Sequence, residues 1–140
     1  MADRLSEAAR GRIMRAIKSK DTRPELMVRK YLFAKGYRYR LHSKKLPGKP
    51  DLVFPGRRKV ILVHGCFWHQ HANPDCTIRV TPSSHEEYWA PKLQRNIARD
   101  AENGVALQGL GWGLLVVWEC ELRENREDTL AGIEEFLGPA

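Results

Sequence analysis

The feature that most constrains this chain is a cluster of reactive side chains directly after an apolar run. The run occupies residues 60–63, and the cluster is His64-Gly65-Cys66-Phe67-Trp68-His69-Gln70-His71. A short continuous apolar run predicts a strand that is buried on both faces of a sheet. Core packing does not require three imidazoles and a thiol in eight residues, so the segment indicates a functional site at the end of this strand.

The spacing of the cysteines predicts a metal site. Cys66, His71 and Cys76 form a C-x4-H-x4-C pattern, and Cys120 ends a second apolar stretch. Three cysteines and one histidine form a tetrahedral ligand set for zinc, and a closed set leaves no position for a reactive water. We therefore expect a structural zinc ion. The alternative is that the thiols are buried as small apolar groups and the histidines are surface polar residues.

Length and composition predict a soluble intracellular protein with one domain, residues 1–140. A chain of 140 residues fits one hydrophobic core. It contains no apolar run long enough to span a bilayer, and no apolar segment behind a basic start, so we expect no membrane partner.

Charge is distributed unevenly along the chain. Residues 1–60 hold 18 Lys and Arg against 5 Asp and Glu, a net charge of +13, whereas residues 61–140 hold 6 against 12, a net charge of −6. Such a basic segment favours a phosphate backbone, because neutralising phosphates releases counterions. Nucleic acid is the expected partner. The alternative is that these cations only solvate helix faces.

Periodicity predicts a mixed sheet flanked by helices, an α/β fold. Apolar residues at helical intervals predict a basic amphipathic helix over residues 6–19. Strict alternation predicts a strand over residues 37–41. The remaining expected elements are strands at 50–54, 59–64 and 114–118 and a closing helix at 126–137.

A capping box predicts a helix over residues 23–35. Thr22 is the expected N-cap, Glu25 stands three positions later, and Pro24 lies in the first turn. Gly36 ends the helix. Its expected buried residues are Leu26, Val28, Leu32 and Phe33.

A second capping box at residues 84–87 predicts a longer helix that ends near Gly104. Pro91 requires either a kink or a start near Ala90. The expected apolar side is Trp89, Leu93, Ile97 and Ala101. Lys92, Asn96 and Asp100 recur every four residues and form one polar stripe.

The residues around two strand ends suggest phosphodiester chemistry. Pro50-Asp51 matches the opening of the nuclease pattern PD-x(n)-(D/E)-x-K, but the later acid and lysine are absent. The Val63 carbonyl can take the place of the missing acid, because magnesium prefers oxygen ligands. His64 and His69 are candidate proton carriers, since imidazole titrates near neutral pH. If the strands are antiparallel, Asp51 and His64 are neighbours.

Phe67 and Trp68 lie between these histidines. Large apolar side chains in a loop can wedge between bases or stack on them, or they can cover the metal site. At this point the chain resembles the very-short-patch-repair (Vsr) mismatch endonucleases. The matching segments are Arg12-Ile13-Met14-Arg15-Ala16-Ile17, Asp21-Thr22, Leu46-Pro47-Gly48-Lys49-Pro50-Asp51, His64 to His71, Tyr88-Trp89 with Lys92, Asn96-Ile97-Ala98-Arg99-Asp100, and Val117-Trp118-Glu119-Cys120.

The resemblance implies a restriction-endonuclease-like fold and a magnesium-dependent activity. Members of that family nick DNA 5′ to the thymine of a T:G mismatch, which arises when 5-methylcytosine deaminates. It implies that Asp51 and the Val63 carbonyl hold magnesium, that His69, oriented by Asp100, activates water, and that His64 assists at the phosphate. Glu25 would support this site.

The resemblance also assigns the other residues. Zinc would be held by Cys66, His71, Cys76 and Cys120. Residues that enter the duplex would be Phe67, Trp68 and Trp89 from the major groove and Met14 from the minor groove, while Lys92 and Asn96 read the mismatched pair. The implied protein is a bacterial cytoplasmic monomer associated with the nucleoid, and mismatch-repair proteins are candidate partners.

Two other functions compete with this one. A nuclease of the same fold could cut paired DNA without a mismatch, as restriction enzymes do. A zinc-stabilised DNA-binding module would have no catalytic activity. Cleavage of T:G and C:G duplexes distinguishes all three.

Overall fold

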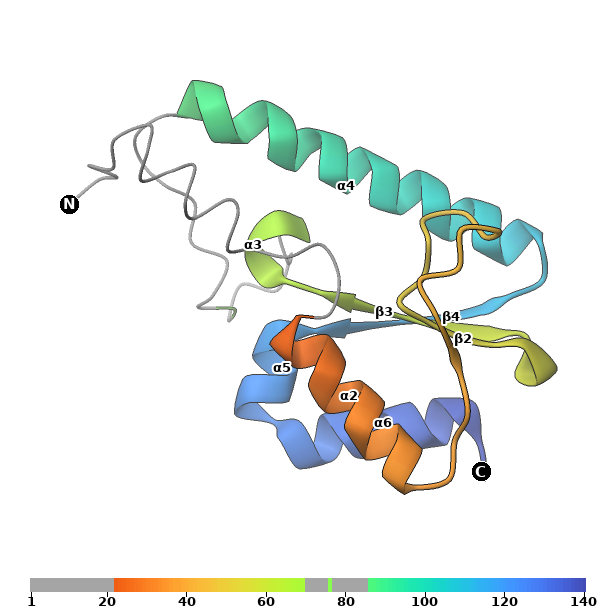
Figure 1. The fold of residues 1–140 in the computed structure, drawn as a ribbon. Coiled ribbons are helices and arrows are strands. Elements are labelled where there is room, and N and C mark those ends of the chain that lie inside the picture. The colour runs from red at the N-terminus through yellow and green to blue at the C-terminus, as the bar shows by residue number, and fades with distance from the viewer. Residues whose placement is uncertain (1–21, 70–75, 77–85) are drawn as a thin grey trace.

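The computed structural model describes residues 22–69, 76 and 86–140, which form one mixed sheet with helices on both faces (Figure 1). Its strands are β1 (Arg40–Leu41), β2 (Leu52–Phe54), β3 (Lys59–His64) and β4 (Gly113–Trp118), in that spatial order. β1 and β3 both run antiparallel to β2, whereas β3 and β4 are parallel. The predicted α/β architecture with a mixed sheet is confirmed. The basic helix expected at 6–19 lies outside the described residues.

The helices form a layer on each side of the sheet. α4 (Glu86–Gly109) covers one face, and α2 (Arg23–Ala34) and α6 (Arg126–Leu137) cover the other (Figure 1). Shorter helices lie in the connecting segments. The 3-10 helix η1 (Pro55–Arg57) joins β2 to β3, α3 (Cys66–His69) follows β3, and α5 (Glu119–Glu124) follows β4. No helix in this part of the chain is long and apolar enough to cross a bilayer.

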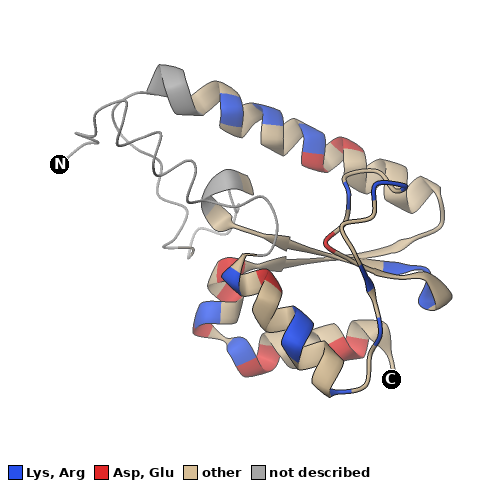
Figure 2. Ribbon diagram, in the orientation of Figure 1, with Lys and Arg blue, Asp and Glu red and all other residues tan. Residues whose placement is uncertain are grey.

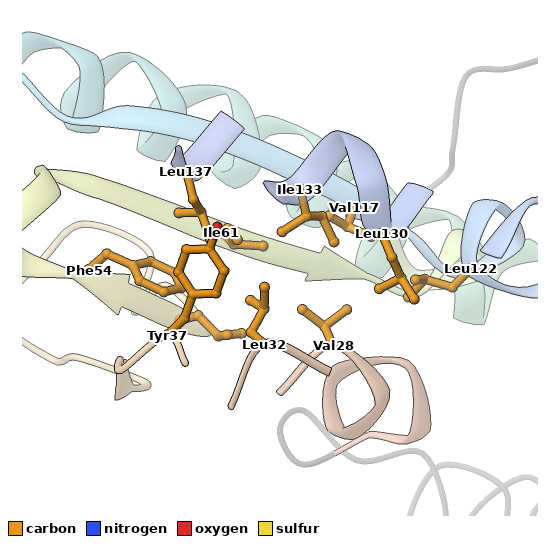
Figure 3. Close-up of a cluster of buried hydrophobic side chains, with 11 residues drawn as sticks. Val28, Leu32, Tyr37, Phe54, Ile61, Val117, Leu122, Leu130, Ile133 and Leu137 are labelled. Carbon is orange, nitrogen blue, oxygen red and sulfur yellow. The ribbon is translucent and has the colours of Figure 1, made fainter. Parts of the chain in front are cut away.

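Alternation along the strands divides the core between the two faces, because successive side chains of a strand point to opposite sides. Val53 and Val60 meet Leu107 of α4. The larger cluster lies against α2 and α6 (Figure 3), and consists of Val28, Leu32, Tyr37, Leu52, Phe54, Ile61, Val117, Leu122, Leu130, Ile133 and Leu137. On β3, the same alternation places His64 on the α4 side.

α2 begins as its capping signal predicts. Thr22 accepts a hydrogen bond from the backbone N–H of Glu25, and Pro24 lies in the first turn. After the helix, Gly36 adopts a φ of +99°, a left-handed conformation that glycine adopts without steric cost. The prediction that Phe33 is buried is wrong. Its side chain is 55% exposed and stacks on the Arg38 guanidinium, while Leu32 enters the core.

The strand predicted over residues 37–41 is shorter than expected, since only β1 pairs in the sheet. Side chains anchor the residues before it. The Tyr37 hydroxyl donates to the carbonyl oxygen of Gly138, and the Tyr39 hydroxyl donates to that of Arg29. The alternation of this segment therefore reflects one buried tyrosine ring, Tyr37, and one partly buried ring, Tyr39, and not a long strand.

α4 differs from its prediction in length and orientation. It contains Pro91 and continues beyond Gly104 to Gly109, because Leu107 is fully buried against the sheet. Burial of that side chain outweighs the ~1 kcal/mol helical penalty of a glycine. Leu93 is buried, but Ile97 is 41% exposed and Ala101 faces solvent, so the expected apolar side was wrong. The half-buried side is the stripe of Lys92, Asn96 and Asp100.

Leu32 and Phe33 provide a matched test of this core. We expect Leu32→Ala to lower the free energy of unfolding by ~2–5 kcal/mol, because it leaves a cavity between α2 and the sheet. Phe33→Ala removes a larger side chain from an exposed position and should cost less than ~1 kcal/mol. Urea denaturation of both variants measures the difference. Equal losses would contradict the described orientation of α2.

Candidate active site

The paired ends of β3 and β4 bring the chemically active residues together. The parallel register joins His64 to Trp118, and the segments that follow are α3 and α5. Side chains from the ends of both strands and from the helices that follow them therefore lie around one end of the sheet. Three groups of candidate ligands gather near it, one carboxylate-rich, one with two imidazoles and one with three thiols.

Asp51 is fixed at the start of β2 by its neighbour strand. Its Oδ2 atom accepts a hydrogen bond of 2.7 Å from the backbone N–H of Val63. β2 and β3 pair antiparallel, which is the condition under which the sequence placed Asp51 near His64, and Asp51 lies beside Val63, the residue that precedes His64. Burial raises the pKa of the Asp51 carboxyl from 3.8 to about 7, and the charge of Glu25 acts in the same direction. The Val63 N–H and His42 oppose this rise.

His42 and Glu25 lie next to this carboxyl group. His42 Nε2 is 2.8 Å from Glu25 Oε2 and 3.9 Å from Asp51 Oδ1. Arg29 donates to the same Glu25 oxygen at 3.1 Å. The resemblance predicted Glu25 at this site, whereas His42 was not among the predicted residues. The observed pairing of Leu41 with Leu52 places His42 opposite Asp51, but this register is not visible in the sequence.

The imidazoles of His64 and His69 form a stacked pair. Their ring centroids are 3.7 Å apart and the ring planes differ by 5°. Trp118 contacts the His64 ring edge to face at 5.0 Å. Burial lowers the pKa of His64 from 6.5 to about 4, and the nearby His69 charge acts in the same direction while Asp100 opposes it. His64 is therefore neutral at pH 7. Its buried Nδ1 atom has no hydrogen-bond partner among the described residues.

Asp100 of α4 orients His69. The Asp100 Oδ2 atom lies 2.5 Å from Nδ1 of His69. A carboxylate only accepts hydrogen bonds, so Nδ1 carries the proton and Nε2 keeps its lone pair. A ring in this state can take a proton from water, and the carboxylate stabilises the cation that results.

Three thiols form the third group. Cys66 and Cys120 each stand two residues beyond the paired strand ends, so the register of β3 and β4 brings them together. The sulfur atoms of Cys66, Cys76 and Cys120 all lie within 4.8 Å of one another. The Cys120 N–H also donates to the Cys66 sulfur at 3.4 Å. Burial raises the pKa of both the Cys66 and Cys120 thiols. His71 lies outside the described residues.

The expected DNA-contacting residues are only partly described. Lys92 and Asn96 share the half-buried stripe of α4 with Asp100, near the same end of the sheet as α3. Phe67 and Trp68 lie within α3 between Cys66 and His69, and Trp89 lies within α4, but their side chains are outside the described part. Met14 is outside it entirely. The loop that we expected around Phe67 and Trp68 is in fact the short helix α3.

An acid at a strand end beside a histidine–aspartate pair suits hydrolysis of a phosphodiester, which defines a nuclease-like site. Residues 2–76 match the family model described as DNA mismatch endonuclease Vsr. The chain therefore belongs to the Vsr family of DNA mismatch endonucleases.

Curated relatives agree with this assignment. The chain is 52% identical over 124 residues to the type II nicking enzyme V.XorIIP of Xanthomonas oryzae pv. oryzae, covering 89% of each protein. It is 39% identical over 137 residues to the DNA mismatch endonuclease Vsr of Escherichia coli K12, covering 98% of this chain and 86% of the relative. The type II nicking enzyme V.NmeAIP of Neisseria meningitidis is 41% identical over 125 residues, with 89% and 87% covered.

The raised pKa of Asp51 predicts a stability that depends on pH. An acid whose pKa is higher in the folded state favours folding at low pH, and this contribution is lost as pH rises from about 4 to about 7. The full loss is up to ~4 kcal/mol. In magnesium-free buffer, Asp51→Asn should therefore raise the melting temperature at pH 8 and change it little at pH 4.

Thermal denaturation across this pH range measures the effect. Asp128→Asn, at an exposed position of α6, is the control for removing a negative charge. An Asp51→Asn variant with the same shift at pH 4 and pH 8 would show that Asp51 titrates as an ordinary acid in the folded protein.

Proposed function

We propose that this protein nicks one strand of duplex DNA 5′ to the thymine of a T:G mismatch left by deamination of 5-methylcytosine. The observation that carries the proposal is the convergence of Asp51, fixed on the Val63 N–H, with the His64–His69–Asp100 group at one end of the sheet. Family membership supports a DNA endonuclease over a DNA-binding module without catalysis. Relatives named as nicking enzymes support cleavage of a single strand.

Magnesium is the metal that fits the Asp51 site. The ligands that this chain offers are a carboxylate oxygen of Asp51 and the carbonyl oxygen of Val63, and hard oxygen ligands suit magnesium. When bound, magnesium offsets the negative charge that develops on the phosphate and the leaving oxygen. Asp51 must be ionised to bind it, so we expect the affinity for magnesium to rise as pH increases towards 7.

His69 is the proposed general base. Nε2 takes the proton of the attacking water, while the Nδ1–H remains bonded to Asp100, whose carboxylate stabilises the imidazolium. The stacked His64 ring stays neutral and so does not repel this cation. We place His64 beside the scissile phosphate, which it assists as a neutral polar group. Glu25 supports the site from α2.

Recognition of the mismatch is assigned to residues at the same end of the sheet. Phe67, Trp68 and Trp89 would enter the duplex from the major groove and Met14 from the minor groove, as apolar wedges do. Lys92 and Asn96, which line α4 beside Asp100, would read the mismatched pair.

A basic surface supports contact with the DNA backbone. Figure 2 shows basic stretches on α4, which carries Lys92, Arg95 and Arg99, and in the loop that joins β1 to β2. This loop contains Lys44, Lys45 and Lys49. It lies directly against α4, since a side chain at Gly48 would come within 2.9 Å of Asn103. The loop and the helix together therefore offer cations to phosphates.

The thiols fit a structural zinc ion. Cys66, Cys76 and Cys120 converge, and His71 is the proposed fourth ligand. Zinc would be held by the cysteines as thiolates, and it would stabilise this deprotonated form, which burial alone disfavours. Such a site would tie α3 to α5 beyond the strand ends. With it, the fold corresponds to a restriction-endonuclease-like domain that acts as a monomer in the bacterial cytoplasm, with mismatch-repair proteins as candidate partners.

Nicking of labelled duplexes tests the proposed function. We expect Asp51→Ala to abolish nicking of a T:G duplex in magnesium while leaving the duplex bound, because the metal ligand is lost. His69→Ala should reduce the rate at least ~100-fold, the contribution of a general base. Sequencing-gel analysis places the cut relative to the thymine.

The matched C:G duplex and an exposed variant control this experiment. Wild-type protein should leave C:G intact, whereas equal cleavage of both duplexes would indicate a nuclease that does not require a mismatch. Glu127→Gln on the exposed side of α6 should nick at the normal rate. Full activity of Asp51→Ala would end the assignment.

The zinc proposal predicts one zinc ion per chain. Cys120→Ser should reduce the zinc content and the melting temperature together, because a serine hydroxyl is a poor zinc ligand. Leu122→Ala, at a buried position of the same helix, should lower the melting temperature but keep the zinc. Elemental analysis measures the zinc content of each protein. Native protein without zinc, or Cys120→Ser protein that keeps one zinc ion per chain, would contradict the proposed ligand set.

A further inference from the structure

Glu25 is almost completely buried, with 1% of its surface exposed. A buried carboxylate requires hydrogen-bond donors, because water no longer solvates it. Two donors reach the same oxygen, Oε2, which accepts from Arg29 at 3.1 Å and from His42 at 2.8 Å. Arg29 is one helical turn away on α2, whereas His42 comes from the loop beyond β1. His42 therefore connects Glu25 to a different part of the fold.

The main chain of His42 is attached to Asp51. Its backbone N–H donates to the Asp51 carbonyl at 3.1 Å, extending the β1–β2 pairing by one residue. The φ of His42 is +46°, in the left-handed region that residues other than glycine rarely adopt. With this backbone conformation, His42 bonds Asp51 through its N–H while its ring reaches Glu25.

The two Asp51 oxygens have different surroundings. Oδ2 accepts the N–H of Val63, which fixes the orientation of the carboxyl group on β3. Oδ1 faces His42, 3.9 Å from Nε2. The Nε2–H of His42 donates its hydrogen bond to Glu25, and His42 therefore holds the Glu25 carboxylate beside that of Asp51. Because this nitrogen carries the proton, it does not offer a lone pair to a metal ion.

We propose that His42 is a positioning residue of the magnesium site, which holds the Glu25 carboxylate next to Asp51 Oδ1. This inference rests on the proposed function, because it requires that Asp51 bind the metal. Magnesium keeps several of its waters in protein sites, and a fixed carboxylate beside its ligand is suited to accept hydrogen bonds from them. Removing a residue that orients the groups around a metal ion, without binding the ion itself, typically weakens metal affinity or activity 10–100-fold.

Manganese binding measured by electron paramagnetic resonance tests the proposal without relying on catalysis. With a nicked T:G duplex bound, His42→Ala should weaken manganese binding ~10–100-fold. The magnesium concentration for half-maximal nicking should rise by a similar factor, while duplex affinity without added metal stays within about twofold of wild type. His42→Gln retains a donor and should recover most of the affinity.

A double-mutant cycle shows whether His42 acts through Glu25. The His42→Ala/Glu25→Gln variant should bind manganese no more weakly than the weaker single variant, because both changes break one bond. Ser43→Ala, the next residue in the same loop, is the control and should bind normally. Should His42→Ala fail to fold, His42→Asn and Glu25→Gln replace it in the cycle.

The outcomes separate this inference from the proposed function. Wild-type manganese affinity in His42→Ala, or fully additive losses in the cycle, would overturn the role of His42. If Asp51→Ala also binds manganese and nicks normally, the proposed function itself fails. If Asp51→Ala loses both activities and His42→Ala loses neither, only the positioning role is wrong.

Discussion

Parallel pairing of β3 with β4 is the constraint on which both the catalytic group and the thiol group depend. The register sets His64 opposite Trp118, and each strand then continues into a short helix. Residues at equal distances beyond the paired ends must lie close together, which is why Cys66 meets Cys120. A shift of one residue would turn His64 to the opposite face and separate the two cysteines.

α4 serves two purposes along one side of its length. Near Gly109, its inward residue is Leu107, which closes the smaller core over Val53 and Val60. One to two turns earlier, the half-buried positions are polar and include Asp100, which fixes His69. The apolar end anchors the helix on the sheet, so that the polar end is held rigidly at the strand ends. The role of this helix therefore follows from which of its residues point inward, and not from its overall composition.

Sequence alone predicted the elements whose signals are local. The Thr22 cap and the bounds of α6 and β3 are confirmed, because capping and hydrophobic patterning depend on neighbouring residues. Errors arose where tertiary packing decides. The Tyr37 hydroxyl bonds to Gly138, about a hundred residues away, which no local pattern reveals.

The site shows the same division. The strand pairing suggested that Asp51 and His64 are neighbours, and the structure places Asp51 on the N–H of Val63, the residue before His64. The Asp100–His69 contact was expected from the family resemblance and is present in the structure. His42 was missed because a histidine in a polar loop has no distinguishing pattern of its own. Its importance follows only from a buried Glu25, and burial at the first turn of α2 depends on how that helix docks against the sheet.

The site therefore forms only when both helical layers are in place. Glu25 comes from the α2 side of the sheet, Asp100 comes from α4 on the other side, and Asp51 lies directly before β2. Three carboxyl groups and a neutral imidazole are held in partly or fully buried positions, which opposes folding unless the surrounding core is strong. The large apolar cluster between the sheet, α2 and α6 supplies that strength a short distance from the acids. The packing that stabilises the fold is thus concentrated on the face of the sheet covered by α2 and α6. The residues at the strand ends contribute less to the core and can therefore be polar or ionisable.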